Sequence, residues 1–414
     1  MRSKFDIYSA PHPRRHEIAV LLACSRTQMD SAVAERLRFL LMQKLDWDYL
    51  LWLASWHRVT RLFMLQLKQL PANLVPVTVL EQLRRQSATQ AHQSLFQLSE
   101  LLRVLRLLAD HGIAAAPFKG PAMAAALYGD PALRESEDLD ILIEASDFHA
   151  AKALLLAHSF RPWETLSPGQ EATYLRYECG YTFVQEQNNI SVDLHWDFMR
   201  KYFALPLDLD LIWQRMQTAT LAGQTINQLS PEDLLLILCL HGGKHLWFGL
   251  NWICDVAELL RTAPQLDWQY VTAQAQRCGC QRLLGVGLHL AHQLLGAELS
   301  AAAVSLSTEP GISGLAARVH AGLFPEAEWE PSAAAKFSFL LDARERWRDR
   351  VSFCWRRVIT PTFSDFKFIS LPSPLSFLYP VFRPVRVMWN DVVAVPMFTA
   401  KRNPIISSPR TDSL

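Results

Sequence analysis

The chain has 414 residues, of which half are hydrophobic and a fifth charged, so we expect a folded protein of two or three domains. Its 41 Lys and Arg residues nearly balance its 40 Asp and Glu residues, and this argues against a nucleic-acid coat protein or a strongly acidic partner. No apolar run reaches the roughly 18 residues of a membrane span, and the N-terminus lacks the apolar segment of a signal peptide.

The seven cysteines are irregularly spaced, and Cys278-Gly279-Cys280 is the only close pair. Zinc and redox motifs usually have two residues between their cysteines, so this spacing favours ordinary reduced thiols. Reduced thiols are typical of a cytoplasmic protein, and we expect that location.

Residues 1–110 are expected to form an N-terminal helical region. Apolar residues recur at three- and four-residue steps after Asp46-Trp47 and again over residues 80–108. His111-Gly112 then provides a helix C-cap.

Residues 111–200 are expected to form an α+β core, because the helical period gives way to short apolar runs. One run, residues 113–118, ends in Lys119-Gly120-Pro121, a strand-to-helix turn. A polar link between the apolar runs 181–184 and 190–196 predicts a hairpin.

Three aspartates stand on the expected strands of this core. In the strand 138–143, Asp138 and Asp140 alternate with apolar residues and therefore share one face. Asp193 has the same relation to its apolar neighbours in the later strand. If the two strands are neighbours, three carboxylates meet, and they could bind the two Mg²⁺ ions of phosphoryl transfer.

Residues 201–342 are expected to form a helical domain whose first helix is capped by Ser230, with Pro231 in its first turn. In the preceding core, Ser146 or Asp147 is expected to cap a helix over about 148–158. The helices of the helical domain are predicted over residues 232–245, 250–261, 268–277 and 282–295.

Residues 343–414 are rich in Arg, Trp and Pro, and we expect an arm that extends over the body of the protein. The basic and aromatic stretch 344–357 could bind RNA or a membrane surface. Because Glu345 and Asp349 interrupt its charge, we favour a solvated helix face with Trp and Phe packed inward.

The motifs of the core resemble the uncharacterised bacterial nucleotidyltransferase family, a branch of the DNA polymerase β-like nucleotidyltransferase superfamily. The resemblance rests on Phe118-Lys119-Gly120, Tyr128-Gly129-Asp130-Pro131, Arg134, Asp138-Leu139-Asp140-Ile141-Leu142-Ile143 and Val192-Asp193-Leu194-His195-Trp196. Weaker likeness on both sides of the core extends it to about residues 30–390. It implies a polymerase β-like α+β core with a mixed sheet, flanked by helical regions.

The resemblance also implies a reaction. Asp138 and Asp140 would coordinate two Mg²⁺ ions, or Mn²⁺, together with the triphosphate of an NTP, and Asp193 would complete the metal site. An acceptor hydroxyl would then attack the α-phosphate and release pyrophosphate. The acceptor stays open between a protein side chain, a tRNA end, a sugar and a small metabolite, so nucleic acid is undecided as a partner.

One departure from the superfamily concerns the phosphate turn, which is usually Gly-Gly or Gly-Ser and here is Lys119-Gly120-Pro121. Gly120 still allows close backbone approach to phosphate, and Lys119 could replace the lost attraction as a point charge. Arg134 is a candidate ligand of phosphate or acceptor, with an ion pair to a nearby carboxylate as the alternative. His195 shares the face of Asp193 and is expected either to take part in the chemistry directly or to hydrogen-bond a carboxylate of the site.

Two further hypotheses compete with this enzyme. The chain could be a nucleotide-binding or scaffold protein that has lost turnover. It could instead be a metallohydrolase, because His241 and His245 lie one helical turn apart and Asp255 follows. The glutamate of a His-Glu-x-x-His motif is missing, so these histidines are expected to pack under, or line the rim of, the catalytic cleft.

Overall fold

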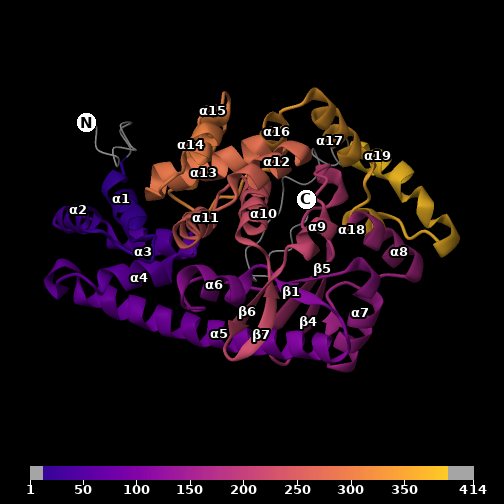
Figure 1. The fold of residues 1–414 in the computed structure, drawn as a ribbon, viewed down its shortest axis with the longest axis horizontal. Helices are drawn as coiled ribbons and strands as arrows, with labels where there is room; N and C mark the ends of the chain where they lie inside the picture. The colour runs from indigo at the N-terminus through magenta and orange to yellow at the C-terminus, as the bar shows by residue number, and fades with distance from the viewer. Residues whose placement is uncertain (1–12, 390–414) are drawn as a thin grey trace.

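The computed structural model describes residues 13–389, which form a mixed α+β structure that is 62% helical. Helices α1–α4 lie at one end of the molecule, and α5 runs from that end along the base to the sheet (Figure 1). Asp46 accepts a hydrogen bond from the Tyr49 amide and caps α3, as its position before the apolar pattern predicts. The helices are α1 (Arg15–Cys24), α2 (Ser31–Leu41), α3 (Trp47–Trp56), α4 (Thr60–Leu67) and α5 (Val77–Asp110).

The core between residues 115 and 203 holds a five-stranded sheet in the order β1-β2-β5-β4-β3. The central pair, β2 and β5, is parallel and the other neighbours are antiparallel, so the sheet is mixed as expected. Its elements are β1 (Ala115–Pro117), α6 (Gly120–Tyr128), β2 (Leu139–Ile143), α7 (Phe148–Ala157), β3 (Arg161–Pro162), α8 (Pro168–Tyr177), β4 (Gly180–Gln185) and β5 (Ile190–His195).

A helical region follows the sheet and lies above it in Figure 1. It begins with α9 and a small hairpin, neither of which the sequence patterns predicted, and the four helices that they did predict are confirmed. The elements are α9 (Leu209–Gln214), β6 (Gln217–Leu221), β7 (Gln224–Gln228), α10 (Pro231–Lys244), α11 (Leu250–Thr262), α12 (Trp268–Cys278), α13 (Gln281–Leu295), α14 (Ala301–Ser307), α15 (Ile312–Leu323) and α16 (Ala333–Asp342).

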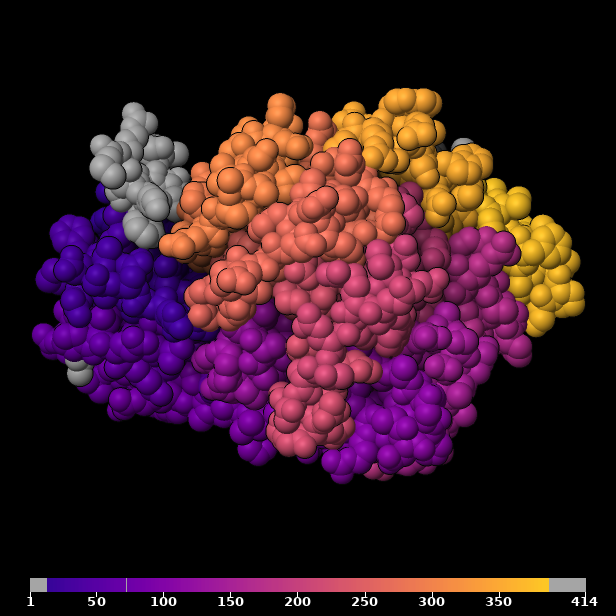
Figure 2. All heavy atoms as spheres, viewed as in Figure 1, coloured from indigo at the N-terminus to yellow at the C-terminus, as the bar shows by residue number. Residues whose placement is uncertain are grey.

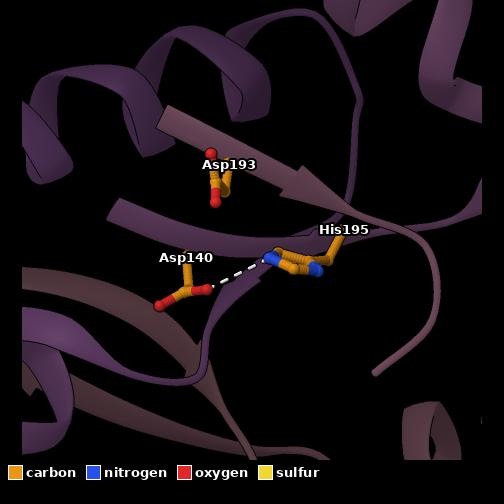
Figure 3. A group of neighbouring side chains, drawn as sticks. All are labelled: Asp140, Asp193 and His195. Atoms are coloured by element: carbon orange, nitrogen blue, oxygen red, sulfur yellow. Dashed lines mark hydrogen bonds and ion pairs between the residues drawn. The ribbon is translucent and has the colours of Figure 1, made fainter. Parts of the chain in front are cut away.

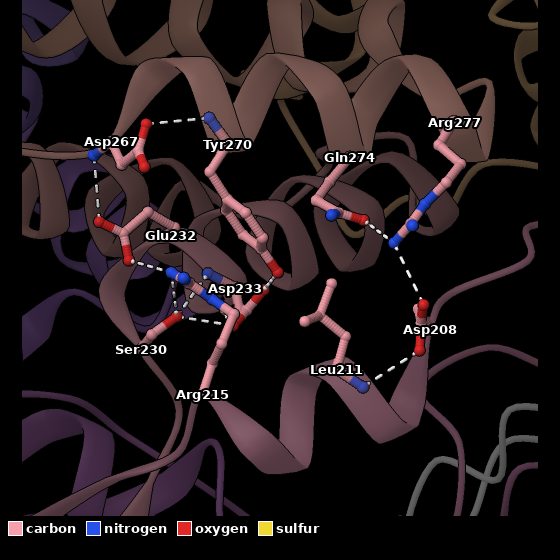
Figure 4. Close-up of polar contacts among 10 residues, drawn as sticks. All are labelled: Asp208, Leu211, Arg215, Ser230, Glu232, Asp233, Asp267, Tyr270, Gln274 and Arg277. Atoms are coloured by element: carbon pink, nitrogen blue, oxygen red, sulfur yellow. Dashed lines mark hydrogen bonds and ion pairs between the residues drawn. The ribbon is translucent and has the colours of Figure 1, made fainter.

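The start of α10 is held by a dense polar network (Figure 4). Ser230 accepts a hydrogen bond from the Asp233 amide, which confirms the predicted N-cap. Arg215 pairs with Glu232 and Asp233, and its guanidinium lies 3.7 Å from the centre of the Tyr270 ring. The Tyr270 hydroxyl donates to Asp233 at 2.7 Å. These contacts fix α10 and α12 to the segment that leaves the sheet.

Two large hydrophobic clusters occupy the interior, and a small third one lies around Tyr379. One packs the sheet against the second half of α5 and against α7, with Leu101, Ile141 and Phe148 among its members. The other joins the N-terminal helices α1–α4 to the helical region α10–α16, although the sheet separates them in sequence. Helix α5 contributes to both, with Leu83 in one cluster and Leu105 in the other. The sheet is therefore held firmly beneath the helical region.

Two local expectations are wrong. Neither Ser146 nor Asp147 caps α7 with its side chain. A 3₁₀ turn (Ala145–Asp147) leads directly into the helix, and Asp147 therefore has a helical backbone. The C-terminal arm is not extended. Its part up to residue 389 folds into α17 (Trp347–Ile359), α18 (Phe363–Phe368), a 3₁₀ segment (Ser373–Leu378) and α19 (Tyr379–Trp389), while 390–414 lie outside the described residues.

The C-terminal helices form the end of the molecule opposite the N-terminal helices (Figure 1). Tyr379 of α19 is fully buried, and its hydroxyl contacts Gln170 of α8 and the backbone of Ile369 and Leu371. Prolines in this segment start or interrupt short helices instead of preventing them. Within residues 13–389, no helix combines the length and apolarity that a bilayer span requires.

Candidate active site

Asp140 and Asp193 lie side by side on the two parallel strands at the centre of the sheet. The register pairs Asp140 of β2 with Asp193 of β5, so both side chains leave the same face. Together with His195, they form a group whose possible ligand atoms all lie within 4.8 Å of one another (Figure 3). The predicted convergence of carboxylates from two separate strands is thus present for this pair.

The alternation of side chains explains why the carboxylates point away from the core. Leu139 and Ile141 of β2, and Val192 and Leu194 of β5, are at most 1% exposed and belong to the cluster that packs on α5 and α7. The residues between them must face the other side of the sheet, toward the helical region.

His195 connects β5 to the carboxylate of Asp140. Its Nε2 atom lies 3.0 Å from Asp140 Oδ1, so the expected hydrogen bond to a carboxylate is present. Burial alone would lower the pKa of His195, but hydrogen bonds and the charge of Asp140 raise it to about 10. The ring fits because the facing residue on β4 is Gly180, where a Cβ atom would come within 2.8 Å of His195 Nδ1.

The three aspartates have different electrostatic surroundings. Burial opposes ionisation of Asp140, but Lys119 and His195 outweigh it and hold its pKa below the usual value. Burial, followed by the charges of Asp140 and Asp193, raises the pKa of Asp138 to about 8. Burial also raises the pKa of Asp193, whose Oδ1 is buried without a hydrogen-bond partner. Lys119 and His195 therefore compensate the charge of Asp140, whereas burial favours the neutral forms of Asp138 and Asp193.

Asp138 immediately precedes β2 and lies outside the group of converging ligand atoms. It lines the same cleft as Asp140, and its pKa responds to the charges of both other aspartates. Asp138 therefore lines the cleft next to this group without belonging to it, and its role as a ligand remains a prediction.

The Lys119-Gly120-Pro121 turn joins β1 to α6 beside the carboxylates. The Lys119 ammonium lies 3.5 Å from Asp140 Oδ1. Gly120 has a φ of +66°, a left-handed conformation that favours glycine, and it opens α6 with Pro121 in the first turn. The turn therefore faces the aspartates, where its predicted phosphate contacts would be made.

Arg134 forms the ion pair that was the alternative to a phosphate contact. Its Nε atom donates to both oxygens of Asp255 in α11, at 2.8 and 3.0 Å, and both side chains are buried. The Tyr128 hydroxyl donates to the same carboxylate at 2.7 Å. Arg134 and Asp255 are 121 positions apart, so their ion pair fixes the loop before β2 to the helical region. Arg134 also lines the cleft.

His241 and His245 line the cleft at the end of α10 but do not form a metal site with Asp255. Their ring centres lie 4.7 Å apart, and His245 stacks on Trp252. The Asp255 carboxylate is occupied by Arg134 and Tyr128. In the part of the chain that the structure describes, the one candidate cation-binding group is the cluster on β2 and β5.

A cleft of about 360 Å³ opens over Asp138 and Asp140 between the sheet and the surrounding helices. That volume is typical of sites for small molecules. Aromatic side chains such as Trp252 and Phe337 line it, and α17 contributes Phe353. Its cationic lining comes from Arg58, Lys119, Arg134, Arg200, Lys244, Lys336 and Arg357. This is an environment for an anionic ligand with a flat or apolar portion.

Arg58 was not among the predicted site residues. It pairs with Glu137 at 2.7 Å and has a φ of +55°, a left-handed conformation that is costly for a residue with a side chain. The preceding His57 is buried, and its Nδ1 accepts a hydrogen bond from the Leu250 amide, which fixes this turn at the edge of the cleft. No spacing rule reveals such a residue, because it reaches the cleft only through tertiary packing.

Comparison with known proteins identifies the family. A family model described as an uncharacterised nucleotidyltransferase matches residues 43–296, which is more than half of the chain and includes both strands of the carboxylate cluster. The chain belongs to this family. It is a nucleotidyltransferase by family, and the α+β fold class predicted from its motifs is confirmed. The match ends before α14, whereas the sequence likeness was expected to continue to about residue 390.

No curated protein matches this nucleotidyltransferase. A solved structure that is similar to it is the crystal structure of an antigenic nucleotidyltransferase-like protein from Paracoccidioides brasiliensis. The two share 18% identity over 50% of this chain and 95% of that one, with a TM-score of 0.31. A likeness of that size carries no argument about substrates.

Proposed function

We propose that this protein uses divalent cations to transfer a nucleoside monophosphate from an NTP to a hydroxyl-bearing acceptor. The observation that carries the proposal is the register of β2 on β5, which sets Asp140 beside Asp193, with His195 hydrogen-bonded to Asp140. Oxygen donors suit Mg²⁺, and the same donors accept Mn²⁺. The buried Asp193 Oδ1 atom without a hydrogen-bond partner fits a cation ligand.

Asp138, Asp140 and Asp193 would together hold the cations. Bound cations supply charge that neutralises the phosphate under attack. The Asp193 carboxylate accepts the proton of the acceptor hydroxyl as that oxygen bonds to the α-phosphorus. The bond between the α-phosphorus and its bridging oxygen then breaks, and pyrophosphate leaves.

The phosphates would lie against the turn that opens α6. Lys119 offers a point charge within reach of Asp140, and Gly120 permits close approach of the backbone. Arg134 is held at the cleft by Asp255, so its guanidinium is oriented before any substrate binds. His195 has a positioning role, because it hydrogen-bonds Asp140, and His241 lines the cleft.

The test is labelling with each of four α-labelled NTPs in turn, with Mg²⁺ and host lysate, followed by identification of the labelled macromolecule or metabolite. We expect one acceptor class to become labelled, with release of pyrophosphate. Asp140→Asn should abolish the signal. Glu144→Gln should not, since this exposed carboxylate lies just beyond the other end of β2.

Other outcomes contradict the proposal. Thermal stabilisation by NTP and Mg²⁺ without pyrophosphate release, across all acceptors tried, identifies a binding or scaffold protein. Hydrolysis that survives Asp140→Asn, in protein that contains zinc, identifies a metallohydrolase at His241 and His245.

A further inference from the structure

Helix α17 carries an apolar row that faces solvent. Trp347 is 73% exposed, Val351 57%, Trp355 63% and Val358 41%. Steps of four, four and three residues place these side chains on one face of the helix. A helix of a globular protein normally turns such a row inward, and the expectation that both tryptophans pack inward is wrong. Only Phe353, on another face of α17, is buried in the core.

A second apolar row lies on the neighbouring helix α19. Val381 is 64% exposed and Val385 59%, and they stand one turn apart. Arg383 of α19 donates a hydrogen bond to the carbonyl of Arg357 in α17, so the two helices are fixed to each other. They lie at the end of the molecule shown in orange and yellow in Figure 2. The six side chains Trp347, Val351, Trp355, Val358, Val381 and Val385 are called the C-terminal apolar rows below.

The same segment has a strong positive charge. Residues 343–389 contain nine Lys or Arg and only three Asp or Glu, whereas the whole chain has a net charge of +1. Arg348 and Arg350 are exposed on α17, one on each side of its apolar row. Arg344 and Arg383 are buried and Arg386 pairs with the buried Asp365, so the exposed positive charge of α17 comes from Arg348, Arg350 and Arg356, while Glu345 and Asp349 are partly buried.

We propose that the C-terminal apolar rows dock this protein on an anionic lipid surface. The tryptophans and the valines beside them would lie together at the boundary between headgroups and acyl chains. The flanking arginines would pair with lipid phosphates while their stems cover apolar surface. This arrangement needs no membrane-spanning helix, because an amphipathic helix binds in the plane of the interface.

Charge and side-chain chemistry favour a lipid surface over the other occupants. A second copy of this chain would bring two positive surfaces together, which is electrostatically unfavourable. Single-stranded RNA would find two tryptophans for stacking, but valines between them offer neither a stacking face nor a hydrogen bond. An anionic membrane is the partner that combines negative charge with an apolar interior.

Docking here would also orient the cleft. Phe353 and Arg357 line the cleft from other faces of the same helix that carries the exposed row. A single helix therefore lies between the lipid surface and the site. The proposal itself does not depend on the reaction, because it rests on exposure and charge alone.

The experiment is co-sedimentation of the full chain with phosphatidylcholine vesicles that contain about 30% phosphatidylglycerol, and with phosphatidylcholine vesicles alone. We expect binding to the first and much weaker binding to the second. The double variant Trp347→Gln/Trp355→Gln should lower the partition coefficient at least roughly tenfold. The matched control is Trp329→Gln, a 40%-exposed tryptophan outside the segment, which should bind like the wild type.

A second variant, Arg348→Glu/Arg350→Glu, separates charge from apolar contact. It should lose binding to the anionic vesicles at about 0.1 M salt, where screening is partial. All four substituted positions are exposed, so circular dichroism should stay unchanged.

Three results would overturn the proposal. One is equal binding by wild type and the tryptophan double variant. Another is a dimer in sedimentation velocity that this variant abolishes, which assigns the rows to a second copy. The third is binding to single-stranded RNA but not to vesicles, which assigns them to nucleic acid.

Discussion

The acidic residues at the start of α10 and those between β2 and β5 have opposite surroundings. At the start of α10, Glu232 and Asp233 pair with Arg215, and Asp233 also accepts from Tyr270 and from the cap residue. Between β2 and β5, burial raises the pKa of both Asp138 and Asp193, and one oxygen of Asp193 has no partner.

The contrast shows how to tell a structural acidic cluster from a site. Both clusters are built from closely spaced carboxylates, so composition alone does not separate them. The protein pairs both carboxylates of the first with its own cations, hydroxyls and amides. In the second, Lys119 and His195 pair with Asp140, but neither Asp138 nor Asp193 has an ion pair among the described residues. A deficit of that kind in a cleft is what a bound cation would remove.

The largest expected effect comes from removing a carboxylate of the proposed cation site. Asp140→Asn and Asp193→Asn should each lower kcat at least about 10³-fold, because each removes a proposed ligand of the catalytic cations. Pyrophosphate release measures this, with Glu144→Gln as the control. Activity above a tenth of the wild-type value in either variant contradicts the assignment.

The next effect concerns Asp255, a carboxylate that is fully buried and fully paired. Asp255→Asn leaves the buried Arg134 guanidinium without its counter-charge and should cost about 3–5 kcal/mol of unfolding free energy. Tyr128→Phe removes one hydrogen bond to the same carboxylate and should cost about 1 kcal/mol. Denaturant unfolding compares the two variants. An equal or smaller loss for Asp255→Asn would show that the ion pair is not what holds this loop.

Asp138→Asn should stabilise the metal-free protein at high pH. The folded protein raises the pKa of Asp138 from about 4 to about 8, so it binds this proton more tightly than the unfolded chain. The contribution of Asp138 therefore makes stability fall as pH rises from about 4 to about 8. We expect a gain of about 2 kcal/mol for the variant at pH 8 and none at pH 4.

Thermal unfolding at both pH values measures this effect. Glu144→Gln, which changes an exposed carboxylate, should show no such pH dependence. Excess Mg²⁺ should stabilise the wild type more than the variant. The same gain at pH 4 and pH 8 would mean that burial and the neighbouring carboxylates do not raise the pKa of Asp138.

The smallest expected effect lies in the compensated cluster. Tyr270→Phe removes the hydroxyl that donates to Asp233 but keeps the ring beneath Arg215. It should cost about 1 kcal/mol in denaturant unfolding and leave kcat unchanged. A loss of activity as large as that of Asp140→Asn would place this network in the catalytic machinery and remove the contrast between the two clusters.

The sequence predicts the pair at the centre of the site because a strand alternates its faces. Asp140 and Asp193 stand between apolar neighbours in two short runs, so one face of each run has to be polar.

Helices α10 to α13 are also predicted to within one or two residues. Ser230 and Pro231 mark the start of α10, and Gly279 and Gly296 end α12 and α13 in left-handed conformations.

Other features depend on tertiary packing and have no local signal. The hairpin β6–β7 is polar along most of its length, so its strands lack an apolar alternation. The partner of Arg134 lies 121 residues away in α11. The exposure of Trp347 and Trp355 also could not be predicted, since an apolar row looks the same whether protein or solvent faces it.

The most direct test of the carboxylate cluster is a crystal structure with Mn²⁺ and a non-hydrolysable NTP analogue, in which anomalous scattering locates the ions. The proposal predicts anomalous density about 2.2 Å from carboxylate oxygens of both Asp140 and Asp193, with the triphosphate beside Lys119. Ions bound at His241 and His245 instead, or a triphosphate that lies away from both aspartates, would contradict it.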